Sequence, residues 1–599
     1  MSKLRNSLVN ENLSPEYLKD LDMDQLQEFC AQIREQLIEI ISKTGGHIGV
    51  NLGVVELTVA LYYVFDLLED SIVWDIGHQV YIQKMLTGRT NLLREIRKNG
   101  GSPGYAFKDE SPFEKVTSSH AGASLSLGLG IALAKQKKKD NSISISVIGD
   151  GSLVEGVAQE ALNHLAVEKS KQLIVLNDNE IALDDNFGGI HEYLCSRKLN
   201  TDKNETYFSS LGVSYIGPID GHDVRLLVHE FEKIKKTISE PTILHIKTEK
   251  GKGLEFMADN SPVKIHWNFP FDPKTGENTE SPKAANYAKF AGAAIDELLS
   301  DEEQAILITP ATLQNSGIYQ VHQKHKSKSY DVSLAEQHAL TLGAGFALEG
   351  VKPIVCFEAT FFQRSFDQIL HDVCVNNLPL LAICARSGHT GLDHLTHHAL
   401  NDISYLRSVP NLNIKMSATS EHLKNLIKNE FYSLSAPTLI LYPYANALDD
   451  VLNEDIFDIN LDPQEKIEED FILILSTGAQ NKNAEALNNK LVKTSNILAK
   501  HVVITEIVPL NPSVVNLIQK AKYIITLEEG YLEAGFGSMI LENIDNFNSN
   551  AKLHRVGFKK EFILHGTRDY IYKKYNLDYE FVHNEIKSKW GDIFNNATC

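Results

Sequence analysis

The chain has 599 residues, of which 43% are hydrophobic and 23% are charged, and its formal net charge is -20 at pH 7. A chain of this length is too long to fold around a single hydrophobic core, so two to four domains are expected. The negative charge argues against a nucleic-acid partner, because the average field would repel a polyanion. Small metabolites are the expected ligands.

The cysteines and the apolar segments indicate where the protein resides. The 6 cysteines form no CxxC pair and no regular spacing, which argues against a disulfide framework or a zinc site and favours a reducing compartment. No uninterrupted apolar stretch reaches the roughly 18 residues of a membrane helix, and residues 1–20 lack the apolar core of a secretory signal. We therefore expect a soluble, cytoplasmic protein with no membrane partner.

Short apolar runs rich in β-branched residues recur between amphipathic helical patterns. They lie at 142–149, 172–178, 241–248, 304–310, 352–358, 378–385, 437–443, 471–478, 501–509 and 523–529. Runs of this kind separated by helices are typical of mainly parallel sheets with helices on both faces. The predicted fold class is α/β.

Two polar, turn-rich segments interrupt this pattern, at about 268–289 and about 442–466. Turn-rich segments between periodic stretches indicate domain boundaries. The sequence therefore predicts three α/β domains, at residues 1–285, 286–463 and 464–599.

Asp150 lies between two glycines where an apolar run ends, and the apolar residues after Gly151 have helical spacing. A strand-to-helix turn of this kind suits a phosphate group, because backbone N–H groups face it and glycine lets it approach. Asp150 would repel a phosphate unless a cation stood between them. Mg²⁺ fits this role, and Asn179, after the next apolar run, offers a second oxygen ligand.

The pairing of Asp150 with Asn179 resembles the motif by which thiamine diphosphate enzymes hold Mg²⁺ and the diphosphate. That resemblance implies that the backbone carbonyl of Ile181 is the third protein ligand of the metal and that Gly151 contacts the cofactor. The motif is specific in that group of enzymes, whereas a lone GDG turn is common in proteins.

The chain resembles the 1-deoxy-D-xylulose-5-phosphate synthase family along nearly its whole length. The resembling segments include "GGHIGVNLGVVELTVALYYVF", "IVWDIGHQVYIQKMLTGR", "DVSLAEQHALTLGAGFALEGVKPIV" and "THHALNDISYLR". The resemblance implies a transketolase-like fold, thiamine diphosphate and Mg²⁺ as cofactors, and a homodimer. The implied reaction joins pyruvate, with loss of CO₂, to an aldehyde, typically D-glyceraldehyde 3-phosphate, giving 1-deoxy-D-xylulose 5-phosphate.

The resemblance also assigns residue roles. Glu336 matches the acid that hydrogen-bonds the cofactor's aminopyrimidine, Phe361 matches the aromatic that stacks on it, and Arg364 follows in the same order. Lys250 matches a lysine near the diphosphate.

Histidines suit proton transfer because imidazole titrates near neutral pH. The histidines at active-site positions are His47, His78, His120, His266 and His397; His47 and His397, with Asp393, are expected at the substrates, and His78 and His266 near the reacting carbonyls.

The segment around His397 also permits a metal-site interpretation. His394, His397 and His398 fall at i, i+3 and i+4 beside Asp393, a spacing that zinc could use. The family resemblance explains Asp393 and His397 as acceptor contacts without zinc.

The acceptor end of the expected site departs from the family. Members hold the acceptor phosphate with two arginines and a tyrosine; Arg386 matches one arginine, but Tyr444 replaces the other and Glu358 replaces the tyrosine. Each lost charge-assisted hydrogen bond is worth roughly 1.5 to 3 kcal/mol, so a phosphorylated acceptor should bind less well. A pair between Glu358 and Arg386 would withdraw that arginine further.

Three functional hypotheses follow. The first is a deoxyxylulose phosphate synthase, and the second is a related 1-deoxyketose synthase that uses a different acceptor, which is unphosphorylated, differently charged or longer. The third, from another class, is a non-catalytic homologue that binds the cofactor or a partner. The presence of Glu336, Asp150 and Asn179 argues against the third, because a silent scaffold has no physical need for all three.

Overall fold

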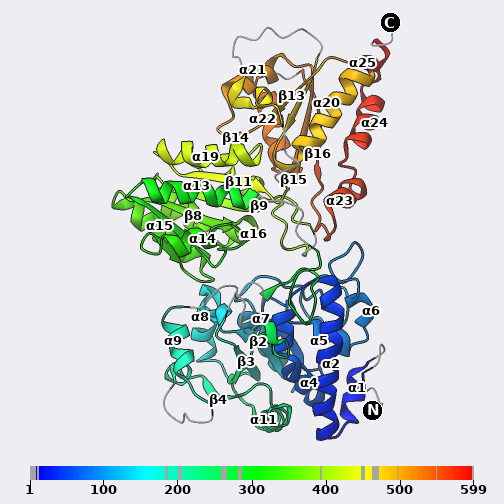
Figure 1. Cartoon of the computed structure of the whole chain (residues 1–599), viewed down its shortest axis with the longest axis vertical. Helices are drawn as coiled ribbons and strands as arrows, with labels where there is room; N and C mark the ends of the chain where they lie inside the picture. Colours follow the sequence, from blue (N-terminus) through cyan, green and yellow to red (C-terminus); the bar gives the residue numbers. More distant parts are fainter. Residues whose placement is uncertain are drawn as a thin grey trace. The chain divides into compact units, whose positions relative to one another are not determined.

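The computed structural model of the chain describes residues 8–9, 13–181, 187–199, 206–257, 266–280, 287–391, 394–446, 452–461, 471–495, 497–547 and 550–596. The chain divides into two compact units (Figure 1). Unit 1 comprises Met1–Ser281 with Ser333–Ala335, and unit 2 comprises Pro282–Val332 with Glu336–Cys599. The division into three domains with limits at 285 and 463 remains a prediction.

Unit 1 is built on a five-stranded parallel sheet in the order β1-β2-β3-β5-β4. The strands are β1 (Ser71–Trp74), β2 (Ser144–Gly149), β3 (Gln172–Asp178), β4 (Ser214–Asp220) and β5 (Thr242–Lys247). Because parallel strands end at the same edge of a sheet, the residues that follow β2, β3 and β5 lie close together. This edge carries Asp150, Asn179 and Lys250.

Both faces of this sheet are covered, which explains why its central strands read as continuous apolar runs. Ile145 and Leu173 pack in one core with α2, α4 and α11, whereas Ile148 and Ile174 pack in another with α7 and α8. The helices of unit 1 are α1 (Pro15–Lys19), α2 (Met23–Thr44), α3 (Ile48–Gly53), α4 (Val55–Val64), α5 (Tyr81–Leu86), α6 (Thr90–Leu93), α7 (Ser124–Lys137), η1 (Gly151–Val154), α8 (Gly156–Leu165), α9 (Gly189–Ser196), α10 (Tyr207–Ser210), α11 (Val224–Thr237) and η2 (Glu255–Met257).

The turn after β2 differs from the sequence expectation. A single helix was expected directly after Gly151, but the structure has a short 3₁₀ helix, η1, and α8 begins only at Gly156. The interruption falls at Glu155, whose backbone is extended (φ -57°, ψ 138°) and whose side chain is 1% exposed. The N–H groups beside Asp150 therefore belong to a tight turn and not to a long helix.

Unit 2 contains a seven-stranded sheet in the order β14-β10-β11-β9-β8-β6-β7. Helices α13 and α19 cover one face and α15 the other (Figure 1). The strands are β6 (Ala305–Thr309), β7 (Ser329–Asp331), β8 (Lys352–Glu358), β9 (Leu381–Ser387), β10 (Asn413–Met416), β11 (Thr438–Pro443) and β14 (Glu506–Val508). The helices are α13 (Tyr287–Asp301), α14 (Tyr319–Lys324), α15 (Glu336–Leu348), α16 (Ala359–Phe362), η3 (Gln363–Ser365), α17 (Phe366–Gln368), η4 (Ile369–Cys374), α18 (Asp402–Leu406) and α19 (Ser420–Tyr432).

A four-stranded parallel sheet in the order β13-β12-β15-β16 forms the rest of unit 2. Its strands are β12 (Ile472–Ser476), β13 (Ala499–Val503), β15 (Tyr523–Tyr531) and β16 (Lys552–Phe558). The helices of this part are η6 (Glu454–Ile456), η7 (Asp458–Asn460), η8 (Gly478–Gln480), α20 (Asn481–Ser495), α21 (Pro512–Lys520), α22 (Phe536–Phe547), α23 (Arg568–Lys574), α24 (Tyr579–Lys589) and α25 (Gly591–Asn596).

The apolar run 501–509 serves both sheets of unit 2. Its first part belongs to β13, and its second part is β14, which pairs antiparallel with β10 of the seven-stranded sheet. The two sheets also share one hydrophobic core. The predicted α/β class with mainly parallel sheets is thus confirmed, and none of the helices within the described ranges is long and apolar enough to span a membrane.

Candidate active site

The carboxyl edge of the unit 1 sheet brings together the predicted metal ligands. Asp150 follows β2 and Asn179 follows β3, and the Asp150 N–H donates to the Asn177 carbonyl (3.2 Å), which fixes the two strand ends to each other. The Asn179 Oδ1 accepts from the Ile181 N–H (3.2 Å). Gly151, the first residue of η1, is buried beside Asp150. The predicted oxygen ligands therefore lie in the two turns that follow β2 and β3, at the same edge of the sheet.

The electrostatics of this edge suit a cation. Burial raises the pKa of Asp150 to about 7, the charge of Asp178 adds to the rise, and Lys250 opposes it. Burial alone would raise the pKa of Asp178, but hydrogen bonds from His245 and Lys247 hold it below its usual value. Two carboxyl groups thus lie close together where water is excluded. A hard divalent cation with oxygen ligands fits such a donor set.

Three of the predicted histidines form a cluster in unit 1. The ring centroids of His47, His78 and His266 lie 5.1 to 5.4 Å from one another. Asn51 holds two of them in place, since its Nδ2 donates to the carbonyls of His47 and His78 (both 2.8 Å). Tyr105 also contacts the cluster, with its hydroxyl 3.4 Å from the His47 Nε2. The arrangement places several imidazoles where they can exchange protons with one bound molecule.

The protonation of this cluster is biased towards neutral rings. Removal from water lowers the pKa of His266 well below its usual value, and the charge of Lys250 with the neighbouring imidazoles lowers it further. A neutral imidazole can accept a proton at physiological pH. Lys250 follows β5 and is 8% exposed, and its charge lowers the pKa of both Asp150 and His266.

His120 lies in the loop before α7. Its Nδ1 is 3.2 Å from the Ser119 hydroxyl. The loop is shaped by the buried Asp75, whose carboxylate accepts from the Gly122 and Ser124 N–H groups (2.8 and 3.0 Å). Burial raises the pKa of Asp75.

Unit 2 holds the second set of predicted residues. Glu336 is the first residue of α15 and is 4% exposed, and Arg364 lies in η3. Phe361, in α16, meets His397 edge to face, with ring centroids 5.9 Å apart. A hydrogen bond from the Thr360 hydroxyl to the Thr396 carbonyl (2.9 Å) joins the same two segments. Phe361 and His397 are therefore brought together, as a shared site requires.

The predicted acceptor residues meet at the carboxyl edge of the seven-stranded sheet. Glu358 ends β8, Arg386 lies near the end of β9 with a left-handed backbone (φ 64°), and Tyr444 follows β11. The Arg386 Nη1 pairs with the Glu358 Oε2 at 3.3 Å, and its guanidinium lies 4.9 Å from the centroid of the Tyr444 ring. Asn315 donates to the other Glu358 oxygen and accepts from the Arg386 Nη2 (3.4 Å).

This cluster confirms that Glu358 pairs with Arg386. The guanidinium is held by a carboxylate, an amide and an aromatic face at once. Arg386 and Glu358 cancel each other's charge, so the edge presents no net positive charge from this pair. A dianion gains less there than it would from an unpaired guanidinium.

The segment 388–398 contains the other histidines. His389 and His398 stack with ring centroids 4.3 Å apart, and burial lowers the pKa of both. His394 is 2.7 Å from the Thr396 hydroxyl through its Nδ1. Asp393 lies outside the described residues. Within the ranges that the structure describes, no three His, Cys, Asp or Glu side chains are placed to hold a metal ion, so nothing there supports the zinc interpretation.

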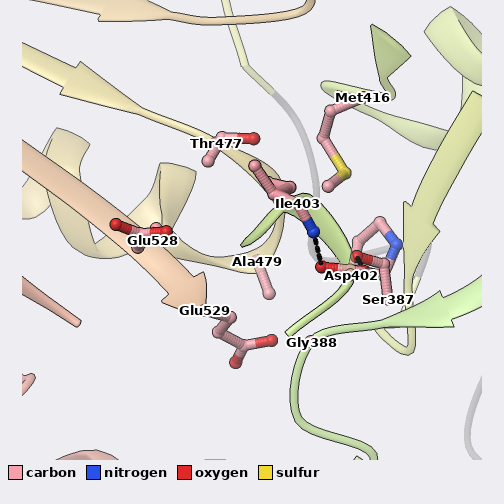
Figure 2. Close-up of a pocket in the computed structure, with 11 residues that line it drawn as sticks. Ser387, Gly388, Asp402, Ile403, Met416, Thr477, Ala479, Glu528 and Glu529 are labelled. Carbon is pink, nitrogen blue, oxygen red and sulfur yellow. Dashed lines mark hydrogen bonds between the residues drawn. The ribbon is translucent and has the colours of Figure 1, made fainter. Parts of the chain in front are cut away.

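A small pocket elsewhere in unit 2 is lined by the acidic residues Asp402, Glu528 and Glu529 (Figure 2). Burial raises the pKa of Asp402 to about 6 and that of Glu528 to about 7. Asp402 accepts from the Ser387 hydroxyl and the Ile403 N–H, and Glu528 accepts from two N–H groups that begin α22 (both 2.8 Å). Asp402 thus links α18 to the end of β9, and Glu528 links β15 to the start of α22; neither has a predicted catalytic role.

Three residues of these clusters were absent from the sequence prediction: Asn51, Tyr105 and Asn315. Asn51 lies within a segment that resembles the family, so that resemblance could have indicated it. Tyr105 and Asn315 carry no local signal, because each reaches its partner from a distant part of the chain.

Three family models match this chain. Residues 9–205 and 196–248 match the family model described as 1-deoxy-D-xylulose-5-phosphate synthase. Residues 283–448 match the pyrimidine binding domain of transketolase, and residues 464–582 match the transketolase C-terminal domain.

Full-length relatives are found among curated proteins. The 1-deoxy-D-xylulose-5-phosphate synthase of Clostridium beijerinckii is 36% identical, over 96% of this chain and 98% of the relative. The enzyme of that name from Pseudoalteromonas translucida is 34% identical, over 97% and 98%. Among solved structures, transketolase from Campylobacter jejuni aligns at 16% identity over 95% of this chain and 100% of its own, with a TM-score of 0.43.

Proposed function

Because the chain belongs to the 1-deoxy-D-xylulose-5-phosphate synthase family, we propose that it condenses pyruvate with D-glyceraldehyde 3-phosphate, releasing CO₂ and forming 1-deoxy-D-xylulose 5-phosphate. The family is one of thiamine diphosphate-dependent, transketolase-type transferases, and the chain is an enzyme of this class. The observation that carries the proposal is this full-length match, and it is supported by the oxygen ligands at the carboxyl edge of the unit 1 sheet and by the three clustered imidazoles of the same unit.

The residues of unit 1 fit the diphosphate end of the cofactor. Asp150, Asn179 and the Ile181 carbonyl would hold Mg²⁺, because they supply oxygen atoms at an edge with excess negative charge. Lys250 would lie near the diphosphate, and Gly151, His78 and His120 would contact the cofactor. When bound, thiamine diphosphate supplies an electron sink for breaking and forming bonds to a carbonyl carbon.

The protein's own groups would orient the substrates and move protons. Glu336 would hydrogen-bond the aminopyrimidine, with Phe361 stacked on it and Arg364 close by. His47, His78 and His266 would hold and deliver protons, since the low pKa of His266 keeps at least one ring ready to accept one. His397 and Asp393 would contact the acceptor. A homodimer and a cytoplasmic location are part of the same proposal.

The proposal is tested with purified protein, pyruvate, thiamine diphosphate, Mg²⁺ and D-glyceraldehyde 3-phosphate. The expected result is CO₂ release that depends on pyruvate and on both cofactors, with a product of the mass of a deoxypentulose phosphate. Absence of CO₂ release with any aldehyde would support the non-catalytic alternative.

A second candidate, with the same chemistry and an unphosphorylated acceptor, is favoured by one observation. The Arg386 guanidinium is engaged by Glu358 and Asn315 and lies over the Tyr444 ring. A phosphate would have to displace a carboxylate that also repels it. D-Glyceraldehyde, which lacks the phosphate, meets no such cost.

Replacing Glu358 with glutamine tests this candidate. The change keeps the shape but removes the negative charge, so Arg386 becomes able to bind a phosphate. We expect the ratio of kcat/KM for D-glyceraldehyde 3-phosphate to that for D-glyceraldehyde to rise about tenfold, which corresponds to one charge-assisted hydrogen bond of about 1.5 kcal/mol.

A matched control is Glu297→Gln, which removes a carboxylate that pairs with Lys424 and Lys428 on the helices of the same sheet. This variant should leave the ratio unchanged. An unchanged ratio in the Glu358 variant as well would show that Glu358 does not govern acceptor choice.

A further inference from the structure

The two residues on either side of Asn179 bind the same lysine. Lys247, the last residue of β5, contacts the Asp178 Oδ2 at 2.7 Å and the Glu180 Oε1 at 3.0 Å through its Nζ. The Nζ also donates to the Leu194 carbonyl (3.1 Å). An ammonium group has three donors. All three are used here, so the lysine fixes both neighbours of the predicted metal ligand.

Strand β5 contacts Asp178 at further points. His245 lies two residues before Lys247, on the same face of the strand, and its Nε2 is 2.9 Å from the same Asp178 oxygen. The other ring nitrogen of His245 is 2.7 Å from the Tyr215 hydroxyl, and the residue is fully buried. The Thr248 N–H donates to the Asp178 carbonyl (2.9 Å).

These side-chain contacts add to pairing that the sheet already provides. Strands β3 and β5 are in parallel register as far as Asp178 and Lys247, so the ladder itself does not need a charged pair at its end. A carboxylate beside Asp150 is electrostatically unfavourable, because each raises the cost of the other's charge. The contacts with His245 and Lys247 offset this repulsion for Asp178, and they also fix the position of its side chain.

The turn that follows needs such support. Glu180 has a left-handed backbone (φ 64°), which is uncommon for a residue other than glycine, asparagine or aspartate and is retained where surrounding contacts enforce it. Glu180 lies between Asn179 and Ile181, and the Ile181 N–H donates to the Asn179 Oδ1 across this turn (3.2 Å). Lys247 contacts the carboxylates just before and just after Asn179.

We propose that Lys247 is a positioning residue for the cation site: by binding Asp178 and Glu180 together, it holds Asn179 and Ile181 in the direction that a cation bound at Asp150 requires. Lys247 does not touch the cation in this scheme. The inference rests on the proposed function, which identifies this edge as the site of the cation that accompanies thiamine diphosphate. Groups that orient metal ligands without touching the metal are known to affect metal affinity strongly.

The test compares Lys247→Met and Lys247→Arg with the wild-type full chain, using Mn²⁺ as a paramagnetic substitute for Mg²⁺. Free Mn²⁺ is measured by electron paramagnetic resonance in the presence of thiamine diphosphate. We expect Lys247→Met to weaken Mn²⁺ binding about tenfold, which is the lower end of the loss in metal affinity seen when a group that orients a metal ligand is mutated. Lys247→Arg keeps a charged donor for both carboxylates and should recover most of the affinity.

Kinetics and stability separate positioning from a merely structural role. For Lys247→Met, KM for thiamine diphosphate at limiting Mg²⁺ should rise in parallel with the Mn²⁺ dissociation constant, while kcat at saturating cofactor stays near the wild-type value. A purely structural role would lower the thermal midpoint in EDTA without changing Mn²⁺ affinity, and that result would overturn the inference.

Two further variants complete the test. Lys169→Met removes a lysine of the same unit that pairs with Glu240 at 2.6 Å on the surface, and it should bind Mn²⁺ as the wild type does. Glu180→Gln weakens the ion pair between Lys247 and Glu180, and it replaces Lys247→Met in the test if that variant does not fold. Unchanged Mn²⁺ affinity in Glu180→Gln would overturn the inference. If the wild type binds no Mn²⁺ with thiamine diphosphate, the proposed cation site is contradicted. If the wild type and Lys247→Met bind Mn²⁺ equally well, only the proposed role of Lys247 is contradicted.

Discussion

Replacing Glu336 with glutamine should lower pyruvate-dependent CO₂ release about a thousandfold, which is within the range for losing a group that transfers protons. Glu336 is 4% exposed at the start of α15, and glutamine has nearly the same shape, so the fold should be kept. Glutamine cannot exchange a proton with the aminopyrimidine, and the cofactor then stays inactive. The measurement is the initial rate of CO₂ release at saturating pyruvate, thiamine diphosphate and Mg²⁺.

The control for this prediction is Glu349→Gln, an exposed acid just beyond the end of α15, which should retain the wild-type rate. Cofactor-dependent Mn²⁺ binding by the Glu336 variant should also be near normal, because the proposed metal ligands lie in unit 1. A Glu336→Gln enzyme with a rate within a few-fold of the wild type would remove Glu336 from the catalytic set.

Replacing Asp150 with asparagine should weaken Mn²⁺ binding in the presence of thiamine diphosphate roughly a hundredfold. Mutating a group that only orients a metal ligand weakens metal binding by about 10- to 100-fold, and the loss of a proposed ligand itself should reach at least the upper value. The change removes the charged ligand and leaves a neutral amide of similar size. Activity should fall with the loss of bound cation and should be partly restored by high Mg²⁺. The measurements are Mn²⁺ titration and the Mg²⁺ dependence of CO₂ release.

Although Asp150→Asn should weaken Mn²⁺ binding, it should raise the thermal stability of the cation-free protein. Burial and Asp178 raise the pKa of Asp150 to about 7, so at pH 8 and without a cation the folded protein carries an unfavourable charge there. Asp150→Asn removes that charge, and the thermal midpoint in EDTA at pH 8 should rise. Asp109→Asn, which changes an exposed acid of unit 1 between α6 and α7, should change neither quantity. A lower midpoint together with normal Mn²⁺ affinity would show that Asp150 is a structural residue.

Much of the fold could be predicted because the strands are buried on both faces. Strands β2 and β3 read as continuous apolar runs, since alternate residues face two different helix layers. The predicted runs do not include β1, β4, β7, β10 or β16: β1, β7 and β10 are only three or four residues long, and β4 and β16 are partly exposed. The splitting of 501–509 between two sheets was also beyond the sequence, because both parts are equally apolar and only their partners differ.

The candidate site could be predicted where residues directly follow neighbouring parallel strands, because the order of the strands then brings these residues together. Asp150 and Asn179 follow neighbouring parallel strands, so their meeting at one edge follows from the fold class. Tyr105 contacts His47 across 58 residues, and Asn315 contacts Glu358 across 43, so neither pairing leaves a local pattern. The Lys247 contact with Asp178 likewise depends on the register of β3 and β5.

The cation site at Asp150 is tested most directly by a crystal structure of the protein with thiamine diphosphate and Mn²⁺, read from the anomalous signal of the metal. The predicted result is one Mn²⁺ bound by the Asp150 carboxylate, the Asn179 amide oxygen and the Ile181 carbonyl, and bridging to the cofactor's diphosphate. A bound cofactor with Mn²⁺ elsewhere, or with the Asp150 turn empty, would contradict the account.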